Sequence, residues 1–355
     1  MEDVGMTGFW AGKRVLVTGH TGFKGSWLSL WLRHLGAKVY GLALAPDTQP
    51  SLFEQLSLEG DLDHRIGDIR DTTLVAARVA EADPDIVFHL AAQPLVLASY
   101  RDPLTTWATN VMGSAHVLEA LRPRSKVCAV VMVTTDKVYQ NHEWHHPYRE
   151  TDPLGGHDPY SASKAAMEIA VDSWRKSFLG TESPVRVASA RAGNVIGGGD
   201  WAANRLLPDI MRALAKGAPI AVRNPGAVRP WQHVLEPLAG YLKLAEHLWN
   251  DADPGLQDCF NFGPEARDIR SAEALVNAVL HHWPGTWDDR SDPNAPHEAG
   301  LLSLSVEKAR AVLNVAPRWD FDRTVKHTVQ WYRDVADGAQ ARDVSLSQIE
   351  AFGAP

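Results

Sequence analysis

The sequence has few cysteines, no excess of basic residues and no long apolar run. Only Cys128 and Cys259 occur among 355 residues, far apart and without metal-ligand spacing, which argues against disulfides and a metal site and fits the reducing cytoplasm. The net charge is −8, so the basic stripe that nucleic-acid binding needs is missing. No apolar run approaches the roughly 20 residues that cross a bilayer. We therefore expect a cytoplasmic protein with no metal, nucleic acid or membrane as a partner.

The sequence does contain enough apolar residues for a large core, in alternating strand and helix patterns. Hydrophobic residues make up 45% of the chain. Apolar runs of strand length occur at 13–18, 39–44, 86–91, 127–134 and 185–191. Helical patterns occupy 26–35, 72–82, 110–121 and 161–178. Strands that alternate with helices predict a Rossmann-type α/β fold, a doubly wound parallel sheet with helices on both faces.

A glycine-rich loop at 18–25 follows the first predicted strand. Gly19, Gly22 and Gly25 allow a tight turn, and the next helix offers its N-terminal N–H groups to a pyrophosphate. Alone, such a loop also fits a purely structural turn. The other residues that we predict to contact a dinucleotide are Thr21, Phe23, Lys24, Asp68, Ile69, Leu90, Ala91, Ala92, Gln93 and Thr109.

The usual mark of cofactor choice is missing after the second predicted strand. An acidic residue is expected there to hold the ribose of NAD, but none occurs before Asp47, and no Arg marks a phosphate site. The choice between NAD and NADP therefore stays open at this point.

Beyond Asn194 the strand and helix rhythm is lost. Glycines at 197–199, Pro-punctuated loops and many tryptophans follow. We expect a smaller mixed α/β cap that closes a cleft at the carboxyl ends of the strands. The predicted division is a dinucleotide-binding domain at 1–190 and a substrate-binding domain at 191–355, with interleaved segments.

Tyr160 and Lys164 lie one helical turn apart and can reach the same site. An ammonium near the phenol favours the phenolate, so Lys164 is expected to lower the pKa of Tyr160 towards neutrality. Tyr160 would then be a general base for an alcohol proton, and Lys164 could hold the nicotinamide ribose. A Tyr and Lys four residues apart also fit an ordinary surface helix.

Thr135, Asp136 and Lys137 follow an apolar strand, at the sheet edge where active-site groups gather. The Thr135 hydroxyl can hydrogen-bond a developing oxyanion. Asp136, kept protonated by burial, could be an acid towards a departing hydroxyl, and Lys137 could abstract an acidified C–H proton. An Asp-Lys pair that caps a turn is the alternative.

The sequence resembles the extended short-chain dehydrogenase/reductases from about Phe9 to the 330s. Within that superfamily it is similar to the 4,6-dehydratases of CDP-glucose. The segments that carry this resemblance are 18–28, 67–71, 91–96, 191–201 and 229–238. The glycine loop and the Tyr-Lys pair mark only the superfamily, whereas His-Thr-Gly-Phe-Lys-Gly-Ser-Trp and Arg-Pro-Trp-Gln-His-Val are more specific.

The resemblance implies a redox-neutral, NAD-dependent reaction on a nucleotide-linked glucose. Tyr160 would take the proton of the 4-hydroxyl while a hydride leaves carbon 4. The ketone acidifies carbon 5, water is lost across carbons 5 and 6, and the hydride returns at carbon 6. Related dTDP-glucose enzymes carry Glu where Lys137 stands, so the base is either Lys137 or a relayed water.

The resemblance also implies a substrate site. Asn194 and Arg229 would hold the diphosphate, and Trp201, Trp231 and His233 would line the nucleotide pocket. Gln93, Thr135, Asp200 and Arg205 complete the predicted set. The superfamily's habit of pairing long helices across a two-fold axis suggests a homodimer or homotetramer, through the helix at 161–178 and the one near Asn110.

Three other functions stay open on sequence grounds. An epimerase or decarboxylase of the superfamily would share the loop and the Tyr-Lys pair but would not need Asp136. A dehydratase of another nucleotide sugar would share the whole catalytic group. A dinucleotide-sensing regulator usually loses the Tyr or the Lys, and both are present here.

Overall fold

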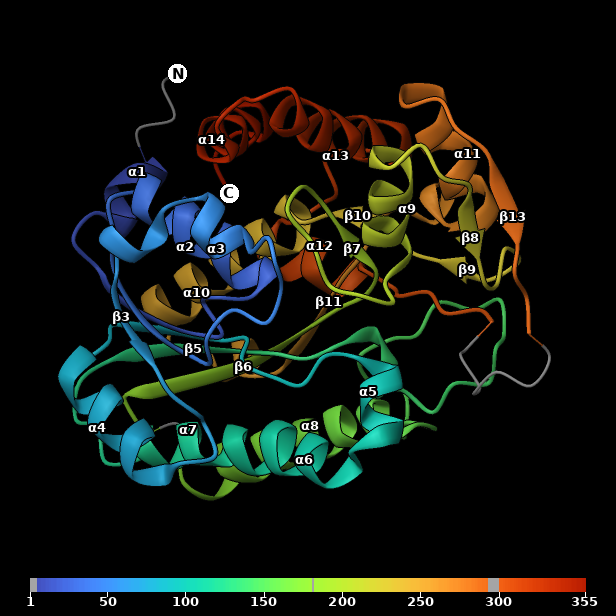
Figure 1. The fold of residues 1–355 in the computed structure, drawn as a ribbon. Helices are drawn as coiled ribbons and strands as arrows, with labels where there is room; N and C mark the ends of the chain where they lie inside the picture. Colours follow the sequence, from blue (N-terminus) through green and yellow to red (C-terminus); the bar gives the residue numbers. More distant parts are fainter. Residues whose placement is uncertain (1–4, 181, 293–299) are drawn as a thin grey trace.

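A seven-stranded parallel sheet forms the middle layer of the computed structural model, which describes residues 5–180, 182–292 and 300–355 (Figure 1). In spatial order the strands are β11 (Cys259–Phe262), β6 (Val185–Ala192), β5 (Cys128–Val133), β4 (Ile86–His89), β1 (Arg14–Thr18), β2 (Lys38–Ala43) and β3 (Asp63–Ile66). All neighbouring strands are parallel. The central strands β4 and β5 are buried along their whole length because both faces of the sheet are covered.

One face of the sheet is covered by α4 (Thr72–Ala82), α7 (Ser114–Leu121) and α8 (Pro159–Ser177), the lower layer in Figure 1. Leu118 and Met167 from these helices pack against Val130 of β5. Next to α8 lie α5 (Val96–Arg101), α6 (Pro103–Trp107) and a π-helical turn, η2 (Ala108–Gly113).

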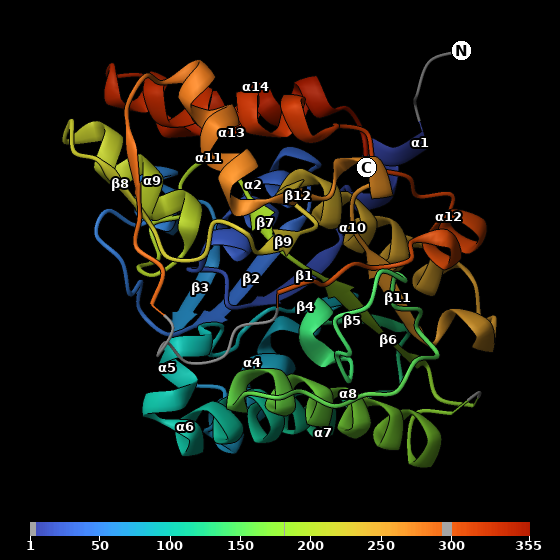
Figure 2. The same cartoon turned by 90° about the vertical axis from the view of Figure 1, so that its right-hand side faces the viewer.

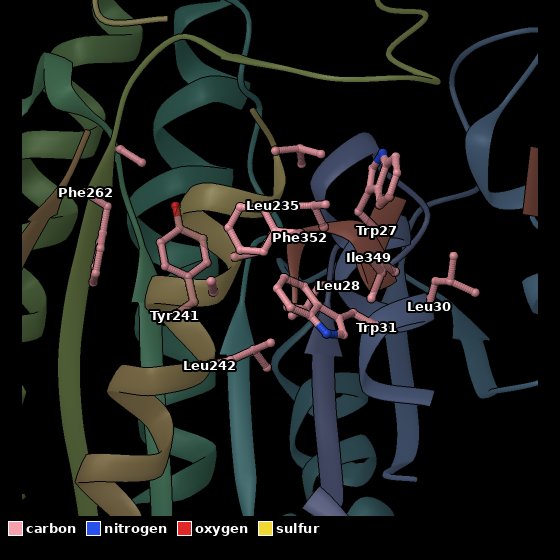
Figure 3. Close-up of a cluster of buried hydrophobic side chains, with 14 of the residues drawn as sticks. Trp27, Leu28, Leu30, Trp31, Leu235, Tyr241, Leu242, Phe262, Ile349 and Phe352 are labelled. Carbon is pink, nitrogen blue, oxygen red and sulfur yellow. The ribbon is translucent and has the colours of Figure 1, made fainter. Parts of the chain in front are cut away.

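The other face is covered by α2 (Phe23–His34) and α10 (Leu235–Asn250), with α13 (Phe321–Ala336) and α14 (Ala341–Phe352) packed outside them. Figure 3 shows Trp27 and Trp31 of α2 meeting Phe352 of α14 and Tyr241 of α10 in one buried cluster. The Trp31 and Phe352 ring centroids are 5.9 Å apart. The C-terminal helices thus complete the core around α2.

A second group of elements lies beside the sheet, at the right of Figure 1 and facing the viewer in Figure 2. It comprises α9 (Leu206–Ala215), α11 (Ala272–His282) and the strand pairs β8 (Ile220–Val222) with β13 (Trp287–Asp289) and β9 (Val228–Arg229) with β12 (Arg270–Ser271). A third pair, β7 (Val195–Ile196) with β10 (Gln232–His233), lies nearer the sheet. The remaining short helices are α1 (Gly5–Trp10), α3 (Leu52–Gln55), η1 (Leu58–Gly60), η3 (Asp136–Val138), η4 (Pro254–Leu256), η5 (Ala266–Asp268) and α12 (Glu307–Leu313).

The predicted Rossmann-type sheet and its flanking helices are confirmed. The helix expected at 110–121 begins as the π-helical turn η2, and α2 starts at Phe23 rather than residue 26. β11 and α10 lie beyond residue 190 yet belong to the sheet layer and its cover, so the two halves interleave in space. The exact domain division stays a prediction. Within the described ranges, no helix combines the length and apolar character needed to cross a bilayer.

Candidate active site

A cavity of about 1380 Å³ opens at the carboxyl ends of β1, β4, β5 and β6. It lies between β1 and β4, where the order of the strands along the sheet reverses, the usual ligand position in a doubly wound sheet. All residues predicted to contact the cofactor line it, from Gly19 to Lys164. The catalytic candidates line it too, as does every predicted substrate residue except His233.

Two glycines of the loop, Gly19 and Gly25, have no room for a Cβ. Gly19 has φ +78°, and a Cβ there would overlap the backbone of Ala91 at the end of β4. A Cβ at Gly25 would overlap the carbonyl of Gly19. Gly22 is the N-cap of α2, with no side-chain hydrogen bond to the helix N-terminus. The first N–H groups of α2 therefore face the cavity wall without a side-chain cap, as pyrophosphate binding requires.

Charged side chains flank this loop. Lys24 is half-buried, and its removal from water together with the charge of Arg205 lowers its pKa to about 8. Asp47 lies in the cavity wall after β2. Asp68, also in the wall, accepts hydrogen bonds from Arg70 Nε at 2.9 Å and Nη2 at 2.6 Å, which lower its pKa. An acidic group is thus available for a ribose hydroxyl although its position in the sequence is unusual.

Helix α8 carries Tyr160 and Lys164 into the cavity. Asp158 caps its N-terminus, accepting from Ser161 N at 3.0 Å and Ser161 Oγ at 2.5 Å. The backbone N–H of Tyr160 donates to Ser99 Oγ at 3.1 Å. Lys164 Nζ donates to the Val133 carbonyl at 3.2 Å, at the end of β5. These contacts fix where the helix starts and bring its active face to the strand end.

The prediction that Lys164 lowers the pKa of Tyr160 towards neutrality is wrong. Burial raises the pKa of Tyr160 to about 12, against the opposing influence of a Thr135 hydrogen bond and the charge of Arg205. Burial and the charge of Lys24 lower the pKa of Lys164 to about 7. Both groups are disfavoured in their charged forms because both have left water. The positive charge that favours the phenolate comes from Arg205, not from Lys164.

The triplet after β5 forms a tight polar group. Asp136 is fully buried, and its Oδ1 accepts from Thr135 Oγ1 at 3.0 Å and Lys137 Nζ at 3.3 Å. Its Oδ2 has no hydrogen-bond partner. A Cβ at Gly193 would overlap this carboxyl, so glycine is needed there. A buried carboxyl oxygen without a partner costs free energy, which a proton or a ligand hydroxyl would offset.

The predicted substrate residues Asn194, Arg205 and Arg229 form another part of the cavity wall. The buried Oδ1 of Asn194 has no partner, and the residue has φ +31°. Arg205 Nη1 is 3.1 Å from Asp200 Oδ2. Arg229 donates to the carbonyls of Val228 at 2.9 Å and Gly300 at 3.2 Å.

The two predicted tryptophans, Trp201 and Trp231, are fixed in the cavity wall by hydrogen bonds of their indole N–H groups. Trp201 Nε1 donates to Gln55 Oε1 at 2.8 Å. Trp231 Nε1 donates to the Arg270 carbonyl at 3.0 Å. Both side chains line the cavity and are also packed, so each combines a structural contact with a place in the wall.

His233 does not line the cavity, and its predicted role in the nucleotide pocket is wrong. Its ring packs 4.7 Å from Trp319 and 6.1 Å from Trp27, between centroids. Burial and the charge of His327 lower its pKa to about 3. These ring contacts hold His233 between α2 and the segment before α13, away from the cavity.

Sequence reasoning missed Asn110, a fully buried residue of the π-helical turn η2. Its Oδ1 accepts from Gln93 N at 2.8 Å, and its Nδ2 donates to Gln93 O at 3.1 Å and Ser163 Oγ at 2.9 Å. It thus joins the loop after β4 to α8. A polar residue within an otherwise apolar helical pattern was the available signal.

The fold and the cavity define an α/β enzyme of the dinucleotide-binding class, with a Tyr-Lys pair and a buried acid at one site. The model of the NAD dependent epimerase/dehydratase family matches residues 15–258. The chain belongs to this family. In the part of the chain that the structure describes, no three His, Cys, Asp or Glu side chains gather as metal ligands.

Curated relatives and solved structures agree with this placement. The chain is 47% identical over 352 residues to the CDP-glucose 4,6-dehydratase of Salmonella typhimurium, covering 97% of both chains. It is 31% identical to the dTDP-glucose 4,6-dehydratase of Streptomyces antibioticus over 90% of this chain and 92% of that one. The fold matches the dTDP-glucose 4,6-dehydratase of Streptomyces venezuelae, solved with NAD, at TM-score 0.77 and 23% identity, covering 90% and 97%.

Proposed function

We propose that the protein is an NAD-dependent 4,6-dehydratase that converts CDP-D-glucose to CDP-4-keto-6-deoxy-D-glucose. The observation that carries this proposal is one cavity that holds both the Tyr160 and Lys164 pair and the Thr135–Lys137 triplet. The first suits oxidation of an alcohol, and the second suits removal of water. The 47% identity to a CDP-glucose 4,6-dehydratase over nearly the whole chain supports the nucleobase and the sugar.

The chain's own residues fit NAD. Gly19 and Gly25 leave space for close approach of a pyrophosphate, and the uncapped N-terminus of α2 supplies N–H donors. Asp47 and Asp68 line the cavity and can accept from ribose or adenine. When bound, NAD⁺ accepts a hydride from carbon 4 of the sugar and returns it at carbon 6.

In the oxidation step, Tyr160 removes the proton of the 4-hydroxyl. The hydrogen bond with Thr135 and the charge of Arg205 favour the phenolate, and they are the groups that oppose the effect of burial. Thr135 is also placed to stabilise the oxygen on carbon 4 as it becomes a ketone. Lys164, held at the end of β5, contributes a donor to the same region.

In the dehydration step, Asp136 gives a proton to the departing 6-hydroxyl. Its carboxyl is fully buried at the cavity, and the unpartnered Oδ2 is free to hydrogen-bond the 6-hydroxyl. Lys137 Nζ, 3.3 Å from Asp136 Oδ1, or a water that it binds, takes the proton of carbon 5 and returns a proton to carbon 5 when the hydride adds at carbon 6. An epimerase would have no use for a buried acid at this place.

The direct test is incubation of the protein and NAD⁺ with CDP-, dTDP-, GDP- and UDP-glucose. We expect the alkali-induced absorbance of a 4-keto-6-deoxy sugar with CDP-glucose. Turnover of only another nucleotide would refute the nucleobase but keep the mechanism. Interconversion of sugar epimers without a deoxy product would favour an epimerase, and bound NAD without turnover of any sugar would favour a sensor.

We also propose an oligomeric state and a cellular compartment for the protein. On adjacent elements of the outer helical layer, Leu104, Trp107 and Met112 of α6 and η2 and Ile169 of α8 are exposed. We expect a second copy of the chain to cover this face in a homodimer or within a homotetramer. Cytoplasmic residence, in keeping with two cysteines that form no disulfide, stays a prediction.

A further inference from the structure

A buried acidic residue lies behind the proposed active site. Glu168 follows Lys164 by four residues on α8, as Lys164 follows Tyr160, so the three share one helix face. Glu168 is 5% exposed and lies outside the cavity wall. It therefore has no access to a substrate, and any effect on the reaction must act through other residues.

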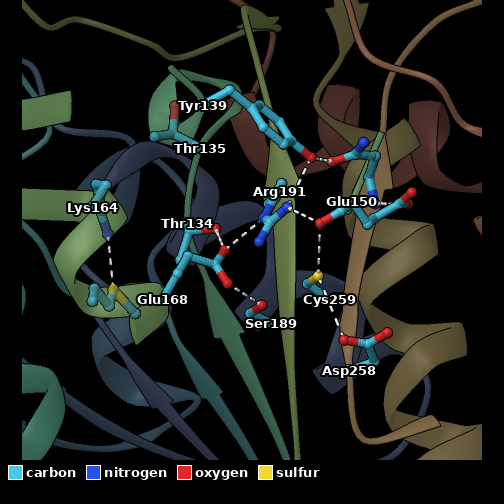
Figure 4. A network of polar contacts seen from close by, with 12 residues as sticks. Thr134, Thr135, Tyr139, Glu150, Lys164, Glu168, Ser189, Arg191, Asp258 and Cys259 are labelled. Carbon is cyan, nitrogen blue, oxygen red and sulfur yellow. Dashed lines mark hydrogen bonds and ion pairs between the residues drawn. The ribbon is translucent and has the colours of Figure 1, made fainter. Parts of the chain in front are cut away.

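Glu168 joins α8 to two neighbouring strands (Figure 4). Its Oε1 accepts from Thr134 Oγ1 at 2.5 Å, directly before the Thr135–Lys137 triplet. Its Oε2 accepts from Ser189 Oγ at 2.6 Å on β6. Arg191 Nε donates to Oε1 at 2.9 Å, three residues before Asn194. The carboxylate thus connects the helix of Tyr160 with the strand ends of the triplet and of Asn194.

Arg191 extends the connection to the next strand. Its Nη1 donates to Tyr139 Oη at 2.8 Å and to the Glu150 carbonyl at 3.2 Å. Tyr139 donates in turn to Asn261 Oδ1 at 2.7 Å, on β11. Every side chain in this path is buried. The network therefore spans three strands and α8 without reaching solvent.

Stability alone does not account for such a pair. Removing two charges from water costs more than their attraction returns unless further hydrogen bonds complete the geometry, and apolar residues of equal volume are often at least as stable. Here the hydrogen bonds that Glu168 accepts come from Thr134, next to the Thr135–Lys137 triplet, and from β6, whose end precedes Asn194. A fully satisfied buried network fixes one arrangement of the elements it joins.

We propose that the Glu168–Arg191 pair positions Tyr160 and Lys164 of α8 against the strand end that carries Thr135 and Asp136. The proposal rests on the dehydratase function. Glu168 and Arg191 are positioning residues, because neither the carboxylate nor the guanidinium is placed to touch the reacting sugar. Precise alignment matters because a misplacement of about 1 Å costs roughly 100-fold in rate.

The pair also affects the charge of Lys164. Burial and Lys24 lower the pKa of Lys164, and the carboxylate of Glu168 raises it. Burial would raise the pKa of Glu168 itself, but the charge of Arg191 and the hydrogen bonds from Arg191, Ser189 and Thr134 outweigh that effect, so Glu168 stays ionised. Removing the carboxylate charge leaves Arg191 uncompensated, and both changes lower the pKa of Lys164 further.

The test is Glu168→Gln, compared with Glu119→Gln, which removes an exposed carboxylate on α7. In Glu168→Gln we expect kcat to fall roughly 100-fold, while KM changes less than about threefold because the cavity wall is intact. The pH at which Lys164 loses its proton, followed by carbon-13 NMR of labelled lysines and assigned with Lys164→Met, shifts down in Glu168→Gln only. Parent kcat together with an unshifted Lys164 titration in a folded Glu168→Gln protein overturns the proposal.

A second variant tests the same positioning role in case Glu168→Gln does not fold. Ser189→Ala removes one hydrogen bond to Oε2 and leaves both charges in place. We expect kcat to fall several-fold and the melting temperature to fall by a few degrees, because a hydrogen bond to a buried carboxylate is lost, while the Lys164 titration stays unmoved. A parent kcat in Ser189→Ala overturns the positioning role. If the parent protein turns over no nucleotide sugar, the dehydratase function fails, while the NMR titration still tests the effect of Glu168 on Lys164.

Discussion

At the scale of single residues, Tyr160 and Asp136 have separate tasks in the proposed reaction. Tyr160→Phe removes the base for the 4-hydroxyl, and we expect loss of at least roughly 100-fold in the oxidation step, typical of general-base catalysis. Absorbance of reduced nicotinamide after one substrate addition measures this step. Tyr40→Phe, a half-buried tyrosine of β2 outside the cavity, is the matched control and keeps parent activity. Equal oxidation rates in Tyr160→Phe and the parent would exclude Tyr160 as the base.

Asp136→Asn keeps the shape of the side chain and removes its acidic proton. We expect reduced nicotinamide to form and persist, while the 4-keto-6-deoxy product forms roughly 100-fold more slowly than in the parent. Asp71→Asn, at the N-cap of α4 and away from the cavity, controls for the change of carboxyl to amide. Dehydration at the parent rate would show that another group protonates the leaving hydroxyl.

The lowered pKa of Lys164 predicts that the free energy of unfolding depends on pH. Its pKa is about 7 in the folded protein and 10.5 as the ordinary value, so the unfolded chain binds more protons between these limits. Stability therefore rises with pH in that window, by at most about 2 kcal/mol between pH 7 and 9 for this group. Urea unfolding of the parent and Lys164→Met at both pH values measures the difference. An equal pH response in the two proteins would contradict the lowered pKa.

At the scale of elements, the start of α8 controls where Tyr160 lies. Asp158 caps this helix, and Tyr160 is two residues further on. Asp158→Ala should cost about 1 kcal/mol of stability and lower kcat, whereas Asp158→Asn, also a good cap, should cost less in both. Thermal unfolding and steady-state kinetics of the two variants check this. If Asp158→Ala lost the expected stability but kept the parent kcat, the helix cap would have no part in placing Tyr160.

The sequence predicted those elements whose pattern is long and regular. The five apolar runs became β1, β2, β4, β5 and β6 within a few residues because buried parallel strands need continuous apolar sequence. The cap was harder, since β7, β9, β10 and β12 have two residues each, too few for a periodic pattern. His233 shows the result: the motif located β10 but not the side to which each of its side chains points.

The site was predictable where a motif names its residues and not where contacts come from distant segments. The glycine loop, the Tyr-Lys pair and the triplet all reached the cavity. The pKa of Tyr160 could not be predicted from spacing, because burial outweighs the neighbouring charges. The link from Glu168 to Ser189 joins positions 21 residues apart and exists only once α8 packs on β6.

At the scale of the whole molecule, the exposed apolar face of α6, η2 and α8 is the expected contact with a second copy. Ile169 is 61% exposed in the single chain. Ile169→Glu places a charge in the contact and should yield monomers, because an unpaired buried charge is strongly unfavourable. Val312→Glu on α12 is the control. Light scattering measures the mass, and a monomeric parent protein would contradict the expected assembly.

The central claim is that one cavity removes a hydride from its sugar, uses the ketone to expel water, and returns that hydride two carbons away. CDP-glucose that carries deuterium at carbon 4 tests it most directly, with mass spectrometry and NMR of the product. The account predicts deuterium at carbon 6 of the same molecule. Deuterium released to solvent, or still at carbon 4, would contradict it.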